Sequence, residues 1–102
     1  MVIAEFNEKC YQVLKKVPKG KVTTYKNIAK ALKTRAYRAV GRAMKMNENA
    51  PAVPCHRVVC SDGNVGGYLG KRDNEKKIKL LKKEGIEIVN GKINLEKFGF
   101  RV

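Results

Sequence analysis

Residues 21–47 read KVTTYKNIAKALKTRAYRAVGRAMKMN and contain two amphipathic helical segments separated by a short break. Thr23 or Thr24 is suited to cap a first helix over residues 25–32, because a threonine hydroxyl accepts a hydrogen bond from the free N–H groups of a helix's first turn. A second helix is predicted over residues 35–45. Two short helices joined by a tight turn favour a helix-turn-helix, although the same pattern is typical of an ordinary helical hairpin.

The second of these helices is basic and rich in small residues. Gly41 in its middle costs about 1 kcal/mol relative to alanine, so a close approach to another backbone is predicted there. The alanines around it would let the helix lie close to a partner surface. Its basic residues are Arg35, Arg38, Arg42 and Lys45.

Residues 4–17 form a further amphipathic segment, whose apolar side chains recur at helical spacing. They predict a helix that Pro18 and Gly20 end. Cys10 lies on the apolar stripe of this helix and is therefore expected to be a core thiol.

The second half of the chain is richer in turns. The run CHRVVC at 55–60 is short and apolar, which favours a strand, and glycines punctuate residues 61–70. A helix is predicted over 73–84, with its lysines facing outward. The dipeptide Asn90-Gly91 between two apolar runs predicts a β-hairpin.

The composition fits a single domain over residues 1–102 that is mostly α with a small β element. The 23 Lys and Arg residues exceed the 9 Asp and Glu residues, giving a formal net charge of +14. Such an excess is the usual footprint of a nucleic-acid-binding protein, although a solvated lysine-rich surface would show it too. Neither a signal peptide nor a membrane span is apparent, so we expect a cytoplasmic protein with free thiols.

The chemistry concentrates at Cys55 and His56, the only histidine of the chain. A thiolate is a far better nucleophile than a thiol, and a neighbouring imidazole held by a carboxylate can take the thiol proton. Adjacent side chains rarely face one another, so we expect a water or a turn between the two. The alternatives are a buried cysteine beside a surface histidine, a metal site that includes Cys60 but lacks a fourth ligand, and a sterically awkward Cys55–Cys60 disulfide.

The segment PCHRVV, preceded by RAVGRAM and followed by VGGYLG, resembles the active-site domain of the O6-alkylguanine-DNA alkyltransferases. The three motifs occur in that family's order and near its spacing, and the resemblance runs from GKVTTY to LLKKEG. It implies a winged-helix-like domain with a helix-turn-helix and an active-site loop after the recognition helix. It implies no metal and no cofactor.

The resemblance also implies roles for individual residues. Cys55 matches the alkyl acceptor, His56 the histidine that relays its proton through a water, and Glu84 the carboxylate that orients this histidine. Asn47 matches a hinge asparagine, and Tyr25 matches the tyrosine whose hydroxyl reaches the flipped guanine.

The DNA-contacting and pocket residues follow in the same way. Arg38 matches the arginine that replaces the extruded base in the stack, and phosphate contacts are expected from Arg35, Arg42 and Lys45. The implied pocket residues are Met44, Val58, Tyr68 and Leu69, with the backbone carbonyls of Cys55 and Val58 as acceptors for the guanine amine and the Leu69 N–H as a donor to O6.

The implied function is irreversible, single-turnover transfer of an alkyl group from O6-alkylguanine in double-stranded DNA to Cys55, after base flipping. The protein is expected to act as a monomer through the minor groove, with little sequence specificity. One alternative is an alkyltransferase-like sensor, which typically carries tryptophan in place of Cys55; another is a generic helix-turn-helix DNA binder with an incidental thiol. The chain departs from the family pattern at Leu69 and Lys71, and we expect it to lack the family's usual N-terminal domain.

Overall fold

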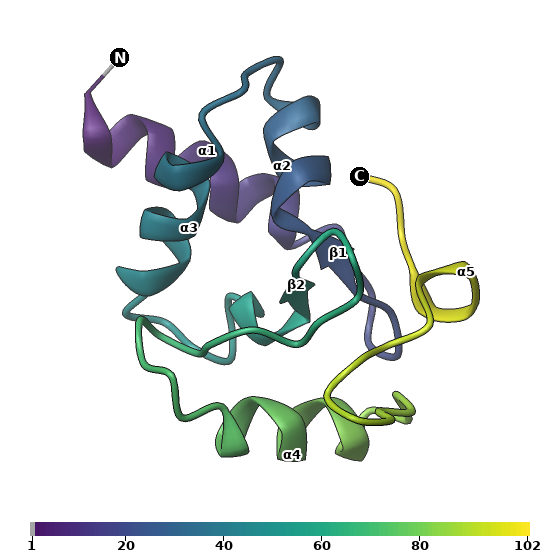
Figure 1. Cartoon of the computed structure of the whole chain (residues 1–102). Coiled ribbons are helices and arrows are strands. Elements are labelled where there is room, and N and C mark those ends of the chain that lie inside the picture. Colours follow the sequence, from purple (N-terminus) through teal and green to yellow (C-terminus); the bar gives the residue numbers. More distant parts are fainter. Residues whose placement is uncertain (1) are drawn as a thin grey trace.

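Three helices, α1 (Ile3–Leu14), α2 (Tyr25–Ala31) and α3 (Tyr37–Lys45), contact one another in the first half of the chain (Figure 1). The structure is a computed structural model that describes residues 2–102. Helix α1 buries Cys10, as predicted, but it ends at Leu14 rather than at residue 17. Val17 is still buried, because a turn closed by the bond from its N–H to the Leu14 carbonyl carries it back onto the core.

The predicted helix-turn-helix is formed by α2 and α3. Thr24 caps α2, since its hydroxyl accepts a hydrogen bond from the Asn27 N–H at 3.0 Å. Helix α3 buries Val40 and Ala43 against the other helices. The close backbone contact expected at Gly41 does not occur within residues 2–102: a Cβ at this position would meet nothing within 4 Å.

The small β element is a parallel pair. Strand β1 (Thr23–Thr24) pairs with β2 (Val58–Val59), and Thr23 is opposite Val58. On the other side of β1 the C-terminal segment continues the pairing, because Val22 donates to the Phe98 carbonyl and Phe100 donates to that of Val22. This arrangement places the chain just before α2 beside the chain just after residue 57.

Residues 55–60 form a strand only in part. Cys55–Arg57 make a single 3₁₀ turn, η1, and only the next two residues are extended. Helix α4 (Glu75–Lys83) contacts η1 from below in the view of Figure 1. The expectation that every lysine of this helix faces outward is wrong, because Lys77 is fully buried.

The C-terminal region keeps the predicted turn but not the predicted strands. Asn90 and Gly91 both have positive φ, and the flanking Val89 and Lys92 exchange two backbone hydrogen bonds. The expected strand KINL does not form, and a short helix, α5 (Leu95–Phe98), begins at its last residue. Within residues 2–102 no helix is long and apolar enough to cross a bilayer.

Candidate active site

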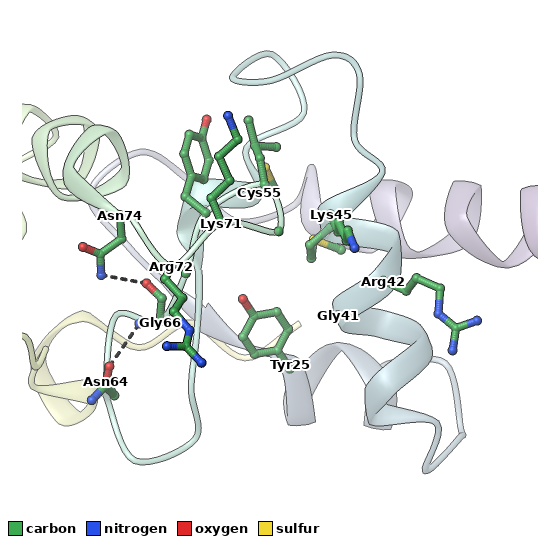
Figure 2. A pocket seen from close by; sticks show the side chains of 15 residues that line it. Tyr25, Gly41, Arg42, Lys45, Cys55, Asn64, Gly66, Lys71, Arg72 and Asn74 are labelled. Carbon is green, nitrogen blue, oxygen red and sulfur yellow. Dashed lines mark hydrogen bonds between the residues drawn. The ribbon is translucent and has the colours of Figure 1, made fainter.

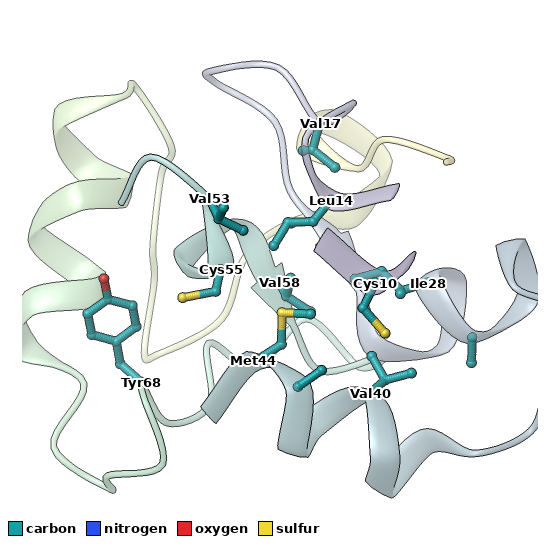
Figure 3. Close-up of a cluster of buried hydrophobic side chains, with 12 residues drawn as sticks. Cys10, Leu14, Val17, Ile28, Val40, Met44, Val53, Cys55, Val58 and Tyr68 are labelled. Carbon is teal, nitrogen blue, oxygen red and sulfur yellow. The ribbon is translucent and has the colours of Figure 1, made fainter. Parts of the chain in front are cut away.

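Cys55 lies at the boundary between the core and a cavity. It is the first residue of η1, is 4% exposed and belongs to the larger apolar cluster together with Met44 and Tyr68. Figure 3 shows its sulfur pointing toward the Tyr68 ring and away from Val58. The thiol therefore rests on apolar side chains on one side and faces the cavity on the other.

The cavity has a volume of about 630 Å³ and is bounded by α3, by the N-terminus of α2 and by the segment 64–74. Figure 2 shows Tyr25, Lys45 and Arg72 arranged around the same space as Cys55. Three of the four predicted pocket residues line it, namely Met44, Tyr68 and Leu69. Val58 does not line it; its side chain is in the core.

The buried imidazole of His56 and the carboxylate of Glu84 lie together, although 28 positions separate them. The His56 Nε2 is 3.1 Å from Glu84 Oε2, and both side chains are at most 11% exposed. Glu84 follows the last residue of α4, and the contact of α4 with η1 brings the two groups into reach.

Arg57 is a third member of this cluster that the sequence reasoning missed. Its guanidinium donates from Nη2 to Glu84 Oε2 at 2.7 Å and from Nε to Glu84 Oε1 at 3.0 Å. Its Nη1 donates to the Val17 carbonyl at 2.9 Å. Burial by itself would raise the pKa of Glu84, but the hydrogen bonds from Arg57 and His56 outweigh burial and lower it. Glu84 is thus a permanent anion at neutral pH.

The hydrogen bonds of His56 assign its tautomer. Nε2 faces an anionic oxygen and must carry the proton, so Nδ1 is the basic nitrogen. Nδ1 is buried and has no hydrogen-bond partner among the described residues. Burial lowers the pKa of His56, and the nearby Arg57 and Lys77 charges lower it further, against the opposing effect of Glu84. The resting imidazole is therefore neutral and available as a base.

The Cys55 thiol does not ionise unaided. Burial raises its pKa, while the Asn47 side chain and the Lys77 ammonium oppose that rise. A protonated thiol therefore needs a base when it reacts, and His56 is the neighbouring one.

Asn47 also shapes the loop that leads into Cys55. Its amide donates from Nδ2 to the Val53 carbonyl at 2.8 Å, and its Oδ1 accepts from the Asn49 N–H at 3.0 Å. The side chain is 7% exposed. Asn47 lies at the start of the segment that ends in Pro54 and Cys55, and its role as a hinge stays a prediction.

Tyr25 begins α2 and lines the cavity. Burial, followed by the two nearby cysteines Cys60 and Cys55, raises the pKa of its hydroxyl to about 12. The hydroxyl accordingly keeps its proton at neutral pH and is available as a hydrogen-bond donor.

The predicted DNA-contacting residues are all exposed on or beside α3. Arg42 and Lys45 line the cavity. Arg35 and Arg38 do not line it. Arg38, Arg42 and Lys45 are on α3, and Arg35 lies just before it.

Lys77 is a second residue whose position was not anticipated. Its ammonium donates to the carbonyls of Val58 at 2.7 Å and Gly67 at 3.1 Å, tying β2 to the loop that precedes α4. Burial lowers its pKa to about 8. Since the Val58 carbonyl already accepts this bond, the ammonium competes at the acceptor that was assigned to the guanine amine.

We expect the stability of the wild-type protein, relative to a Lys77→Met variant, to rise between about pH 7 and pH 10 by roughly 2–3 kcal/mol. The unfolded chain keeps the Lys77 proton up to its ordinary pKa of 10.5, whereas the folded chain releases it at about 8. The unfolded state therefore binds more protons in that window. Urea unfolding at several pH values tests this, with the exposed Lys79→Met as control. A pH-independent difference would contradict it.

No group of three or more His, Cys, Asp or Glu side chains within residues 2–102 is placed to hold a metal ion. The three cysteines are free thiols.

Comparisons with known proteins find a matching family. Residues 5–86 match the family model described as "6-O-methylguanine DNA methyltransferase, DNA binding domain". A methylated-DNA–protein-cysteine methyltransferase of Candida glabrata is 47% identical over 85 residues, which are 82% of this chain and 40% of that protein. The chain thus spans less than half the length of this relative.

Two solved structures are similar in fold. The O6-methylguanine-DNA methyltransferase of Pyrococcus kodakaraensis superposes with a TM-score of 0.71 at 49% identity, over 79% of this chain and 46% of that one. S. pombe Atl1, in complex with damaged DNA containing O6-carboxymethylguanine, superposes with a TM-score of 0.89 at 31% identity and full coverage of both chains. The mostly helical fold with its small sheet is therefore shared with both proteins.

Proposed function

The chain belongs to the O6-methylguanine-DNA methyltransferase family, a family of DNA-repair proteins, and from this premise we propose that it transfers the alkyl group of an O6-alkylguanine in DNA to Cys55. One observation carries the proposal: the Cys55 thiol faces a cavity of about 630 Å³, and the neutral imidazole of the next residue in sequence, His56, is held by Glu84. A cavity of that size is in the range that holds a small organic ligand.

The proposed reaction begins with the thiol proton. It passes from Cys55 Sγ, through a bridging water, to Nδ1 of His56, and Glu84 stabilises the imidazolium that forms. The sulfur then attacks the alkyl carbon, an S–C bond forms, and the C–O6 bond breaks with its electron pair going to guanine. Tyr25 donates a hydrogen bond to the leaving base, and the proton taken from the thiol ends on the released guanine. The thioether product has no hydrolytic return path, so each chain acts once.

Helix α3 is proposed to bind the minor groove of duplex DNA. A damaged base inside the stack cannot reach Cys55 unless it is flipped out, at a cost of a few kcal/mol. Gly41 has open space before it, which suits close approach of a DNA backbone. The exposed Arg35, Arg42 and Lys45 supply phosphate contacts, and such contacts carry little sequence information.

The second candidate function is damage sensing without transfer. The full-length similarity to S. pombe Atl1 favours it, because the DNA bound in that structure still contains its O6-carboxymethylguanine. The presence of a thiol at position 55, facing the cavity, supports transfer instead. The two candidate functions share the DNA-binding step and differ only in whether the Cys55 sulfur accepts the alkyl group.

Intact-protein mass spectrometry after incubation with a duplex containing one O6-methylguanine separates these functions. Transfer adds the mass of one methylene group to the protein and leaves an unmodified guanine in the duplex. Tight binding without a mass change would identify a sensor. Equal affinity for damaged and undamaged duplex would identify a general DNA binder.

We expect Arg38→Ala to slow alkyl transfer from duplex DNA at least about tenfold, because the gap left by the flipped base is then unfilled and each 1.4 kcal/mol is worth a factor of ten. Reaction with free O6-benzylguanine, which needs no flipping, should stay near the wild-type rate. Single-turnover assays on both substrates test this, with exposed Arg101→Ala as the arginine control. Parallel loss on both substrates would contradict the assigned role of Arg38.

A further inference from the structure

Four basic residues, Arg42, Lys45, Lys71 and Arg72, line the cavity beside Cys55, although Figure 2 shows the Arg42 guanidinium directed away from it. No Asp or Glu is among the described residues that line it. The side-chain ion pairs of the described residues join other groups and involve none of the four. Asp73, the carboxylate next in sequence, accepts a hydrogen bond from the Glu75 N–H at the start of α4. The positive charge at the rim is therefore not neutralised by a side-chain ion pair.

Lys45 is held at this rim by packing. A Cβ built on Gly70 would lie 2.6 Å from Lys45 Cγ and 2.9 Å from its Cδ and Cε, so the aliphatic stem crosses directly over Gly70. The stem joins α3 to the loop on the opposite wall, and long lysine stems commonly pack in this way while the ammonium stays in water. The glycine is needed here for this close contact as well as for its positive φ of 78°.

Lys71 and Arg72 are positioned by a tight turn. Tyr68 and Lys71 exchange two backbone hydrogen bonds of 3.0 Å, and Leu69 and Gly70 between them both have positive φ. Asn74 donates to the Gly66 carbonyl at 2.8 Å and closes the base of the loop. Figure 2 shows the Arg72 guanidinium between Gly66 and Tyr25, on the side of the cavity that faces the phenol.

We propose that Lys45, Lys71 and Arg72 make the pocket selective for O6-guanine adducts that carry a carboxylate, so that an O6-carboxymethyl group is processed faster than a neutral group of the same size. The inference rests on the proposed alkyl transfer. An adduct seated against Cys55 places its substituent in the cavity that the cations surround, where a carboxylate gains attraction that an uncharged amide does not. The phosphates of the DNA backbone are the other anions that these side chains could meet.

A matched pair of lesions isolates the charge. Duplexes of one sequence carry O6-carboxymethylguanine or O6-carbamoylmethylguanine, which replaces the carboxylate with a neutral amide of almost the same shape. We expect the single-turnover rate ratio of carboxymethyl to carbamoylmethyl to be at least about fivefold at low salt and to approach unity at high salt, where exposed charges are screened. The Lys71→Gln/Arg72→Gln variant should bring the low-salt ratio close to unity.

The control variant Lys82→Gln/Lys83→Gln removes the same charge from the exposed end of α4 and should keep the wild-type ratio. A wild-type ratio near unity would overturn the inference. So would an equal loss on both lesions in the Lys71/Arg72 variant, which would identify these side chains as phosphate contacts.

A separate measurement tests the proposed function itself. O6-methylguanine in the same duplex reports alkyl transfer whatever the selectivity, and absence of transfer from all three lesions would reject the function. In that case the ratio of dissociation constants for the carboxymethyl and carbamoylmethyl duplexes still tests the selectivity, with the same expected ratio and the same variants.

Discussion

Cys55→Ser is expected to abolish alkyl transfer completely while leaving binding to damaged DNA within about threefold of wild type. A serine hydroxyl is a much weaker nucleophile than a thiol with a base beside it. The substitution is small and sits at the edge of the apolar cluster, so the fold should lose only about 1 kcal/mol from placing a hydroxyl there.

Two measurements on the same samples test this expectation. Intact mass reports transfer, and a fluorescence-based titration with a duplex containing O6-methylguanine reports binding. Cys60→Ser is the matched control and should gain the methylene mass as the wild type does. Transfer by Cys55→Ser, or its loss in Cys60→Ser alone, would place the acceptor elsewhere.

Glu84→Gln is expected to produce the second large effect, a loss of at least about a hundredfold in the transfer rate. The amide cannot stabilise the imidazolium that forms on His56, and it leaves the buried Arg57 guanidinium without its anion. Removing one partner of a buried ion pair typically costs 3–5 kcal/mol. The variant should therefore also lose about 2–4 kcal/mol of stability at neutral pH.

The pH dependence of this stability loss has a definite sign. The folded pKa of Glu84 is lower than its ordinary value of 4.5, so the stability that the anion contributes is complete above that value. It disappears as the pH falls through the lowered folded pKa. The difference between wild type and Glu84→Gln should therefore shrink in acid.

Single-turnover kinetics and urea unfolding measure the two effects. Glu75→Gln removes one charge from an exposed pair with Lys79 and should change neither by more than a small factor. Wild-type kinetics in Glu84→Gln would show that His56 does not depend on this carboxylate.

The sequence predicted those parts of the fold that depend on interactions between residues close together in the chain. The Thr24 cap depends on the chain immediately around it, and the Asn90-Gly91 turn requires the positive φ that Gly and Asn adopt readily. Helix α3 followed from apolar spacing. Helix α5 was missed because the apolar residues of KINL fit a strand equally well, and because the cap by Asn94, whose Oδ1 accepts from the Glu96 and Lys97 N–H groups, was overlooked.

Site residues could be predicted from the sequence only where they lie in the motifs that resemble the family. The resemblance identified His56 and Glu84 as a pair, and the structure brings them together. Nothing in the spacing pointed to Arg57 as the second partner of Glu84, because its position depends on the packing of η1 against α4. Lys77 was missed because lysines are rarely buried. Its burial is explained only by its hydrogen bonds to two backbone carbonyls, which the sequence does not reveal.

The three hydrogen bonds donated by the Arg57 guanidinium limit which substitutions the protein can tolerate. The guanidinium links Glu84 to the Val17 carbonyl beyond the end of α1, so the carboxylate that serves His56 also holds distant parts of the chain together. A substitution at position 57 or 84 would therefore destabilise the fold as well as the site. Cys55 is not a partner in these ion pairs, so a substitution there leaves them in place. On the proposed function, a single substitution at this position would turn an alkyltransferase into a damage sensor and leave this network in place.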